Sequence, residues 1–191
     1  MNMFFWITAI LITLYTGWTY IPDILKWKIK PHAFSWLPWT ILTGIAFIIQ
    51  IQNGEDIWWF GALAASAFVC AIIFLLSLKF GEKKITHGDT IALISCIILI
   101  VFWLWVKNDI LALILVCLID AFAFFPTWRK SWLKPKEENI SMYALSSFKS
   151  FLSLFGLRNF IFVNWLYPVF LIIINFAFTI YLVWRRKIIK K

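Results

Sequence analysis

The sequence predicts an all-α integral membrane protein with seven transmembrane helices. Of its 191 residues, 63% are hydrophobic, and the mean hydropathy of +0.87 exceeds that of an ordinary soluble domain. The apolar residues form long runs between short polar breaks, and they do not alternate with polar residues as in a transmembrane barrel. Because a backbone inside a bilayer must satisfy its own hydrogen bonds, we expect each run to form a helix.

Seven apolar runs can be separated at polar or charged breaks. In chain order they span approximately residues 3–20, 36–52, 57–78, 90–106, 110–125, 142–157 and 160–184. Most approach the ~20 residues that cross a ~30 Å hydrocarbon core, and the shorter runs would also fit a buried helix. The loops between them are short and leave no room for a soluble domain.

The net charge of +9 is concentrated on one side of the predicted membrane. Basic residues gather after the first, third, fifth and seventh runs, whereas the remaining loops hold only Lys107 and Arg158. By the positive-inside rule, the N-terminus is expected outside and the C-terminus in the cytoplasm. The charge therefore indicates topology, and nucleic-acid binding is not expected. The minimal loops and the Lys-, Ile- and Phe-rich composition favour a bacterial inner (plasma) membrane.

Two similar phrases indicate that the chain is duplicated. IPDILKWKIKP begins at Ile21 and FPTWRKSWLKP begins at Phe125, and each runs from a proline to a Lys-Pro pair at a constant offset. We expect a first three-helix repeat over residues 1–78, a linker helix with its flanking loops over 79–109, and a second repeat over 110–191. Because one extra helix separates two three-helix repeats, the two bundles are predicted to be parallel.

This 3+1+3 layout, with the phrases YIPD and FFPT around Pro22 and Pro126, resembles the PQ-loop family. That family includes the SWEET sugar carriers, the lysosomal cystine and cationic amino-acid exporters, and the KDEL receptor. The resemblance covers nearly the whole chain and implies a carrier in which Pro22, Pro38 and Pro126 flex a cytoplasmic gate. The chain departs from the family by lacking the glutamine that names it and by having Ala144 in place of a fourth gating proline.

Elementary chemistry gives the prolines two readings that do not depend on the family. A proline lacks an N–H donor and clashes with the preceding turn, so it either ends a helix or kinks one. For Pro22 and Pro126, helix termination and a gating hinge both fit the sequence. Pro168 is followed by more apolar residues, which favours a kink.

Two ionisable residues interrupt the apolar runs near the middle of the predicted membrane. Asp120 lies in ILALILVCLIDAFAFF, and Lys149 lies in SSFKSFL. A charge at that depth costs ~2.5 to ~10 kcal/mol or more, so each should face the bundle interior or a water-filled path. Asp120 is a candidate proton or cation site, with a hydrogen bond or ion pair that holds helices together as the alternative. An Asp120–Lys149 ion pair is a further hypothesis, and snorkelling of Lys149 toward the cytoplasm is its alternative.

Three further polar residues complete the candidate pathway. Thr16 and Thr43 occupy the positions of the first repeat that match Asp120 and Lys149. One half of the site is therefore ionisable and the other only polar, which suits a polar or charged solute. Asn175, in LIIINFAF, is similar in placement to an asparagine that SWEET carriers use for substrate binding.

These features predict a transporter that moves a small polar solute across the lipid bilayer by alternating access, with proton coupling left open. A binding protein of the KDEL-receptor type and a lipid-handling or scaffold subunit are the alternatives, and a homo-oligomer is left open. The sequence contains no catalytic motif, phosphate-binding loop or paired membrane histidines. Enzymatic activity, a metal and a cofactor are therefore not expected.

Overall fold

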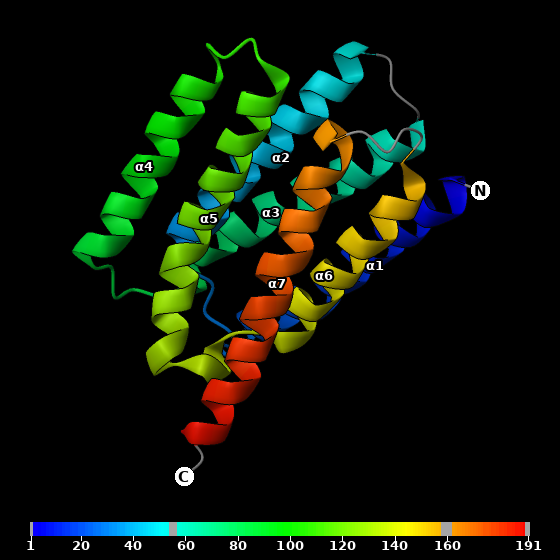
Figure 1. Ribbon diagram of the computed structural model, residues 1–191. Coiled ribbons are helices and arrows are strands. Elements are labelled where there is room, and N and C mark those ends of the chain that lie inside the picture. Colours follow the sequence, from blue (N-terminus) through cyan, green and yellow to red (C-terminus); the bar gives the residue numbers. More distant parts are fainter. Residues whose placement is uncertain (1, 54–56, 158–161, 190–191) are drawn as a thin grey trace.

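The computed structural model describes residues 2–53, 57–157 and 162–189, and this part of the chain is all-α, without strands. The helices are α1 (Asn2–Leu25), α2 (Ala33–Asn53), α3 (Ile57–Phe80), α4 (His87–Trp103), α5 (Asp109–Leu133), the short 3₁₀ helix η1 (Pro135–Glu137), α6 (Ile140–Gly156) and α7 (Phe162–Ile188). Figure 1 shows the α4–α5 connection at the upper end of the bundle and the C-terminus at the lower end. The connections that follow α1, α3 and α5 lie toward the lower end.

The order of neighbouring helices repeats between the two halves of the chain. In the first half, α3 packs against both α1 and α2, and in the second half α7 packs against both α5 and α6. The halves meet where α1 packs on α6 and α2 packs on α5. The remaining helix, α4, lies against α5 and α2 at the side of the bundle (Figure 1). Each half therefore joins the other through its first and second helices.

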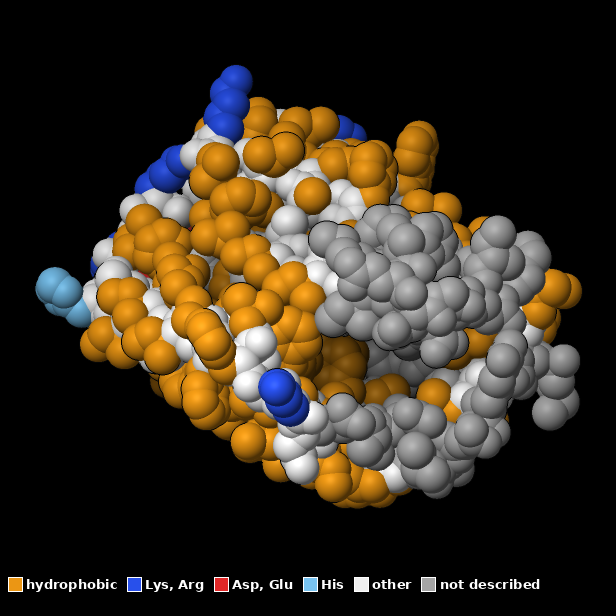
Figure 2. Space-filling model, turned by 90° about the horizontal axis from the view of Figure 1, so that it is seen from above, with side chains coloured by type: hydrophobic (Ala, Val, Ile, Leu, Met, Phe, Trp, Pro, Cys, Tyr) orange, Lys and Arg blue, Asp and Glu red, His pale blue; other side chains and the backbone are white. Residues whose placement is uncertain are grey.

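Within the described part of the chain, three helical segments are long and apolar enough to cross a membrane: Met3–Leu25, Ile110–Leu133 and Trp165–Ile188. The segments Ala64–Phe80 and His87–Trp103 are apolar but shorter. Apolar side chains cover much of the surface in Figure 2, and Trp18 is 80% exposed on α1. Soluble proteins rarely expose contiguous apolar surface on this scale. The length of these helices and the apolar surface indicate a protein embedded in a membrane.

The prolines of the two repeated phrases lie inside their helices. Pro22 lies within α1 and Pro126 within α5, so the expectation that they end these helices is wrong. The turns after Pro126 stay helical and bury Thr127, whose hydroxyl donates to Ser35 Oγ on α2 at 2.9 Å. The first helix instead ends near Trp27, whose φ of 60° lies in the left-handed region. The hinge role of the prolines stays a prediction.

Candidate functional site

A cavity of about 440 Å³ lies inside the bundle, between the two halves of the chain. Its wall is formed by α1, α2 and α3 of the first half and by α5, α6 and α7 of the second, with one residue of α4. It extends from Trp6 and Trp103, near the upper ends of α1 and α4, to Trp36 and Tyr143 in the first turns of α2 and α6. Figure 2, which looks onto the upper face, shows a hollow near its centre.

The structure brings the predicted pathway residues together in this one cavity. Each comes from a different helix, so their proximity depends on the packing of the two halves rather than on local sequence. The wall includes Asp120, Lys149, Asn175, Thr16 and Thr43. The predicted gating prolines Pro22, Pro38 and Pro126 are not among the described residues that line it. Pro168, which was predicted to kink the last helix, is part of the wall.

Asp120, on α5, is 2% exposed and is held by hydrogen-bond donors from two other helices. The Tyr167 hydroxyl of α7 donates to Asp120 Oδ2 at 2.6 Å, and the Trp39 side chain of α2 also donates to this carboxyl group. A carboxylate can accept about four hydrogen bonds, so these two donors leave it able to accept another. Asp120 can therefore still bind a proton or a donor group of a solute.

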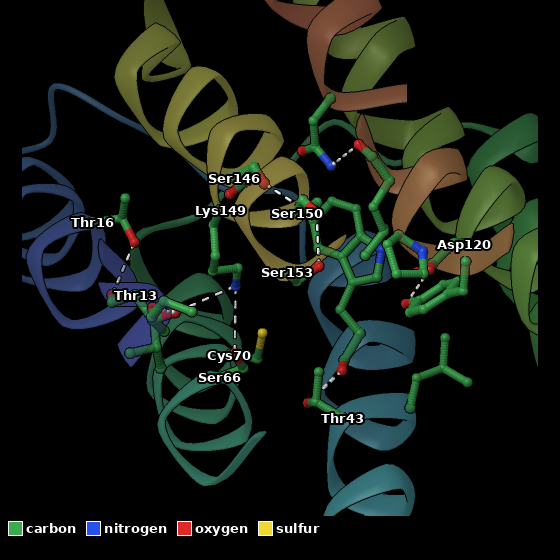
Figure 3. Close-up of a pocket in the computed structure, with 18 of the residues that line it drawn as sticks. Thr13, Thr16, Thr43, Ser66, Cys70, Asp120, Ser146, Lys149, Ser150 and Ser153 are labelled. Atoms are coloured by element: carbon green, nitrogen blue, oxygen red, sulfur yellow. Dashed lines mark hydrogen bonds between the residues drawn. The ribbon is translucent and has the colours of Figure 1, made fainter. Parts of the chain in front are cut away.

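Lys149, on α6, contacts only neutral groups within the described part of the chain. Its Nζ lies 3.3 Å from Thr13 Oγ1 on α1 and 3.4 Å from Ser66 Oγ on α3 (Figure 3). No ion pair joins Lys149 to Asp120 among the described residues, so the hypothesis of a formed pair is wrong. The physical reason is that α7 packs between α5 and α6, which keeps these two consecutive helices apart. Snorkelling is also wrong, because the amine reaches across to the first half of the chain.

Most of the other polar side chains of the wall hydrogen-bond back to their own helices. Their donor protons are used by backbone carbonyl groups one turn earlier, at 2.7–3.0 Å, and their oxygen lone pairs remain available. These bonds run from Thr13 to Ala9, Thr16 to Thr13, Thr43 to Trp39, Ser150 to Ser146 and Ser153 to Ser150. The Asn175 amide likewise donates to the Leu171 carbonyl at 2.9 Å. These hydroxyl groups therefore present acceptors to the cavity.

The lower end of the cavity is closed by buried ion pairs that the sequence analysis missed. Glu138, between η1 and α6, accepts hydrogen bonds from the hydroxyls of Tyr20 and Tyr143, each at 3.0 Å, and pairs with Lys130. The Lys130 and Glu138 side chains are 1% and 0% exposed. Lys130 Nζ also donates to the Lys30 carbonyl at 2.5 Å, which ties α5 to the α1–α2 connection. Because Tyr143 also lines the cavity, this network forms part of its floor.

A second buried carboxylate, Asp89, joins the α3–α4 connection to the same end. Arg129 Nε donates to Asp89 Oδ1 at 2.7 Å, and Thr86 forms a capping box with Asp89 at the start of α4. His32 Nε2 lies 3.5 Å from Asp89 Oδ2, and the Phe34 N–H donates to His32 Nδ1 at 3.3 Å, which leaves the proton of a neutral imidazole on Nε2. Burial lowers the pKa of His32 to about 4, so this histidine is neutral at pH 7.

Two further ion pairs at the lower end are more exposed to solvent than the Lys130–Glu138 pair. Lys134 pairs with Glu82 at 2.6 Å, and Lys30 pairs with Glu137 at 2.9 Å, so the connections after α1, α3 and α5 are joined to one another. The hydrogen bond to Glu82 raises the pKa of Lys134. The available signal was that Glu82, Asp89, Glu137 and Glu138 lie in the same loops as the basic residues. The bases exceed the acids in these loops, and these acids supply partners for some of the bases.

Comparison with known protein families, with curated proteins and with solved structures finds no match for this chain. The resemblance to the PQ-loop family therefore rests on the sequence phrases and the predicted helix layout alone. The function has to be argued from the cavity and from the ion pairs that close its lower end.

Proposed function

We propose that this chain is a carrier that moves a small polar solute across a membrane by alternating access. In this proposal the seven helices all span the membrane as two parallel three-helix bundles, with α4 as the linker. The N-terminus is outside, and the lower end faces the cytoplasm of a bacterial cell. The repeated order of helix neighbours supports the two-bundle arrangement, because α3 and α7 occupy equivalent places in their halves.

One observation carries the proposal: charged side chains line a cavity between the halves, and a network of buried ion pairs lies below its floor at the lower end. A packed scaffold has no use for an unpaired charge at such depth, since burying it is costly. A carrier needs such a cavity and also needs a closed end that can open. The lower end is held by contacts between loops and helix ends, which can separate when the two halves move as rigid bodies.

Access to the lower side requires the two halves to part near Trp39 and Phe124. These aromatic side chains lie in the cavity wall with ring centroids 4.8 Å apart, one from each half. Just below them, Thr127 Oγ1 donates to Ser35 Oγ at 2.9 Å, which also joins the halves. Pro126 adjoins Thr127 on α5, where a bend of the helix would widen this contact. In this proposal the prolines are hinges of a cytoplasmic gate.

Proton coupling is part of the proposal and would use Asp120. Its partners are neutral donors, so gain or loss of a proton changes the charge of the cavity without breaking an ion pair. Exposure of the cavity to each side in turn would let Asp120 exchange its proton with both compartments. Transport would then depend on the pH gradient, and Asp120→Asn would remove that dependence while leaving the cavity in place.

The test is ligand binding followed by flux. Purified protein is heated in detergent with sugars, amino acids and organic acids, at mildly acidic and at neutral pH, because a ligand of the folded state raises the unfolding midpoint. Each stabilising solute is then supplied in radiolabelled form to proteoliposomes, with protein-free liposomes as the control. Saturable uptake supports the carrier. Binding without uptake contradicts it.

The alternative is a binding protein of the KDEL-receptor type, which would hold a ligand without moving it. The closed lower end favours this reading to the same degree, because a receptor needs access from one face only. The flux experiment separates the two: a receptor gives stabilisation without uptake, whereas a carrier gives both.

A further inference from the structure

We infer that the cavity recognises a small organic acid, with the Lys149 ammonium group binding its carboxylate. This inference names the substrate class of the proposed carrier, and it therefore rests on the cavity described above.

Among the described residues, Lys149 lacks the kind of partner that the buried Lys130 has at the lower end. Lys130 is paired with the Glu138 carboxylate and also donates to two backbone carbonyl groups. Lys149 contacts two neutral hydroxyls, at 3.3 and 3.4 Å, which is long for a hydrogen bond from an ammonium group. An ammonium carries three donors and is stabilised at depth by an anion. A bound carboxylate would supply that anion inside the cavity.

Asp120 does not take this place. Its carboxyl group is held by Tyr167 and the Trp39 side chain, and α7 separates its helix from that of Lys149. Figure 3 shows Asp120 and Lys149 on opposite sides of the drawn residues, with other cavity side chains between them. The two groups leave the cavity with one cationic wall and one acidic wall. A ligand carboxylate is attracted to the first wall and repelled by the second, which fixes its orientation.

The hydroxyl groups near Lys149 offer acceptors to the cavity, so the ammonium group is expected to decide whether an anion binds. Thr13, Ser150 and Ser153 each donate to a backbone carbonyl of their own helix, so their lone pairs face the cavity. The Thr13 lone pair holds the ammonium in place, and none of these lone pairs binds an anion. Discrimination between an acid and its neutral amide is therefore expected to depend on Lys149 itself.

The rest of the wall fits an apolar body. Among the described residues, the cavity is lined by Trp6, Trp36, Trp39 and Trp103, together with Phe124. A volume of about 440 Å³ lies in the usual range for small-molecule sites. The ligand class that suits both the cation and the aromatic side chains is a carboxylate with an apolar or aromatic body, such as a short-chain or aryl-substituted acid.

The experiment compares acids with their amides on purified protein in detergent. The probes are 3-phenylpropionate and hexanoate, with 3-phenylpropionamide and hexanamide as neutral counterparts, and binding is followed by the unfolding midpoint and by tryptophan fluorescence. We expect the acids to bind roughly tenfold or more tightly than the amides, as loss of one charge-assisted contact predicts. Lys149→Gln should abolish this preference and Lys149→Arg should keep it. Lys136→Gln, at an exposed position in η1, is the matched control.

Three results would overturn the inference: no acid binds, the amides bind as tightly as the acids, or Lys149→Gln keeps the preference for acids. If Lys149→Gln does not fold, the ratio of acid to amide affinity in the wild type and in Lys149→Arg still tests the inference. Failure of the inference differs from failure of the proposed carrier. If an acid binds but is not transported into proteoliposomes, the carrier is refuted and the acid-binding site is not. If only neutral solutes show saturable flux, the acid as substrate is refuted and the carrier is not.

Discussion

Two lysines inside the bundle, the buried Lys130 at the lower end and the part-buried Lys149 in the cavity wall, have opposite surroundings. Lys130 is 1% exposed and is paired with Glu138, which two tyrosine hydroxyls also contact. Lys149 contacts only the hydroxyls of Thr13 and Ser66 within the described part of the chain. The first lysine is used to hold helices and loops together. The second is held in place without a counter-ion.

The contrast separates structural charges from charges that are available to a ligand. A buried ion pair whose members are both satisfied adds cohesion, and removal of one member leaves the other unpaired at high cost. A part-buried cation that has no anion among the described residues already bears part of that cost, so its removal does not destabilise the fold in the same way. A mutation of Lys130 should therefore lower stability more than it lowers ligand binding. A mutation of Lys149 should lower ligand binding more than it lowers stability.

The largest effect is expected for Lys130→Met. The substitution leaves the Glu138 carboxylate buried without its cation, and the cost should be about 3–5 kcal/mol of unfolding free energy. Equilibrium unfolding in detergent measures it. Lys149→Met is the matched comparison, and we expect it to change stability by less than about 1 kcal/mol because it removes an unpaired charge. Equal losses in the two variants would contradict the distinction between the regions.

The next effect concerns pH and His32. Its pKa is lowered from 6.5 to about 4 in the folded protein, so between these values the unfolded chain binds a proton that the folded chain does not. Stability should therefore fall as the pH drops from about 6.5 to about 4, by about 2–3 kcal/mol from this group. Unfolding measured across this range should show a shallower pH dependence in His32→Gln. An unchanged slope would show that His32 is protonated when folded.

A smaller loss is expected for Lys134→Met. Lys134 pairs with Glu82 at 2.6 Å, but its side chain is 40% exposed, so solvent screens the pair. Exposed ion pairs are typically worth less than about 1 kcal/mol, and the loss should shrink further when salt is added. The unfolding midpoint at low and high salt measures this. A loss as large as that of Lys130→Met would mean that the whole lower end behaves as one coupled network.

The smallest effect is expected for Thr16→Val in the cavity. The Thr16 hydroxyl donates to the Thr13 carbonyl of its own helix at 2.8 Å. When the hydroxyl is lost, that carbonyl still accepts its backbone hydrogen bond within the helix. Stability should change by no more than about 0.5 kcal/mol, and ligand affinity by no more than about twofold. Thermal unfolding with and without ligand tests both. A strong loss of binding would place Thr16 in direct contact with the solute.

The sequence was sufficient to find the charges of the cavity. Asp120 and Lys149 interrupt apolar runs, and the cost of burying a charge in a membrane gives such residues an interior position whatever the details of packing. The all-α class followed in the same way from the apolar composition. The hydroxyl-rich wall and the position of Trp39 depend on which faces of six helices meet, and no local pattern reports that.

The partners of the charges could not be predicted from the sequence. The Asp120–Lys149 pair was expected because α5 and α6 are consecutive, whereas α7 packs against both of them. The pairing of Lys130 with Glu138 depends on the bend of the chain at η1. The continuation of α5 beyond Pro126 likewise depends on burial of Thr127 against Ser35 from the other half. Contacts between distant segments decided each of these cases.

The most direct test of the account uses Cys70, a native thiol in the cavity wall. In a Cys96→Ala, Cys117→Ala background, a membrane-impermeant thiol reagent is applied either to intact cells or to inside-out vesicles. A cavity open only at the upper, outward face predicts rapid labelling of Cys70 in cells and slow labelling in vesicles. Glu138→Gln, which weakens the lower end, should raise the rate in vesicles. With Glu138 intact, equal labelling of Cys70 in cells and in inside-out vesicles would contradict the account, and so would labelling in vesicles alone.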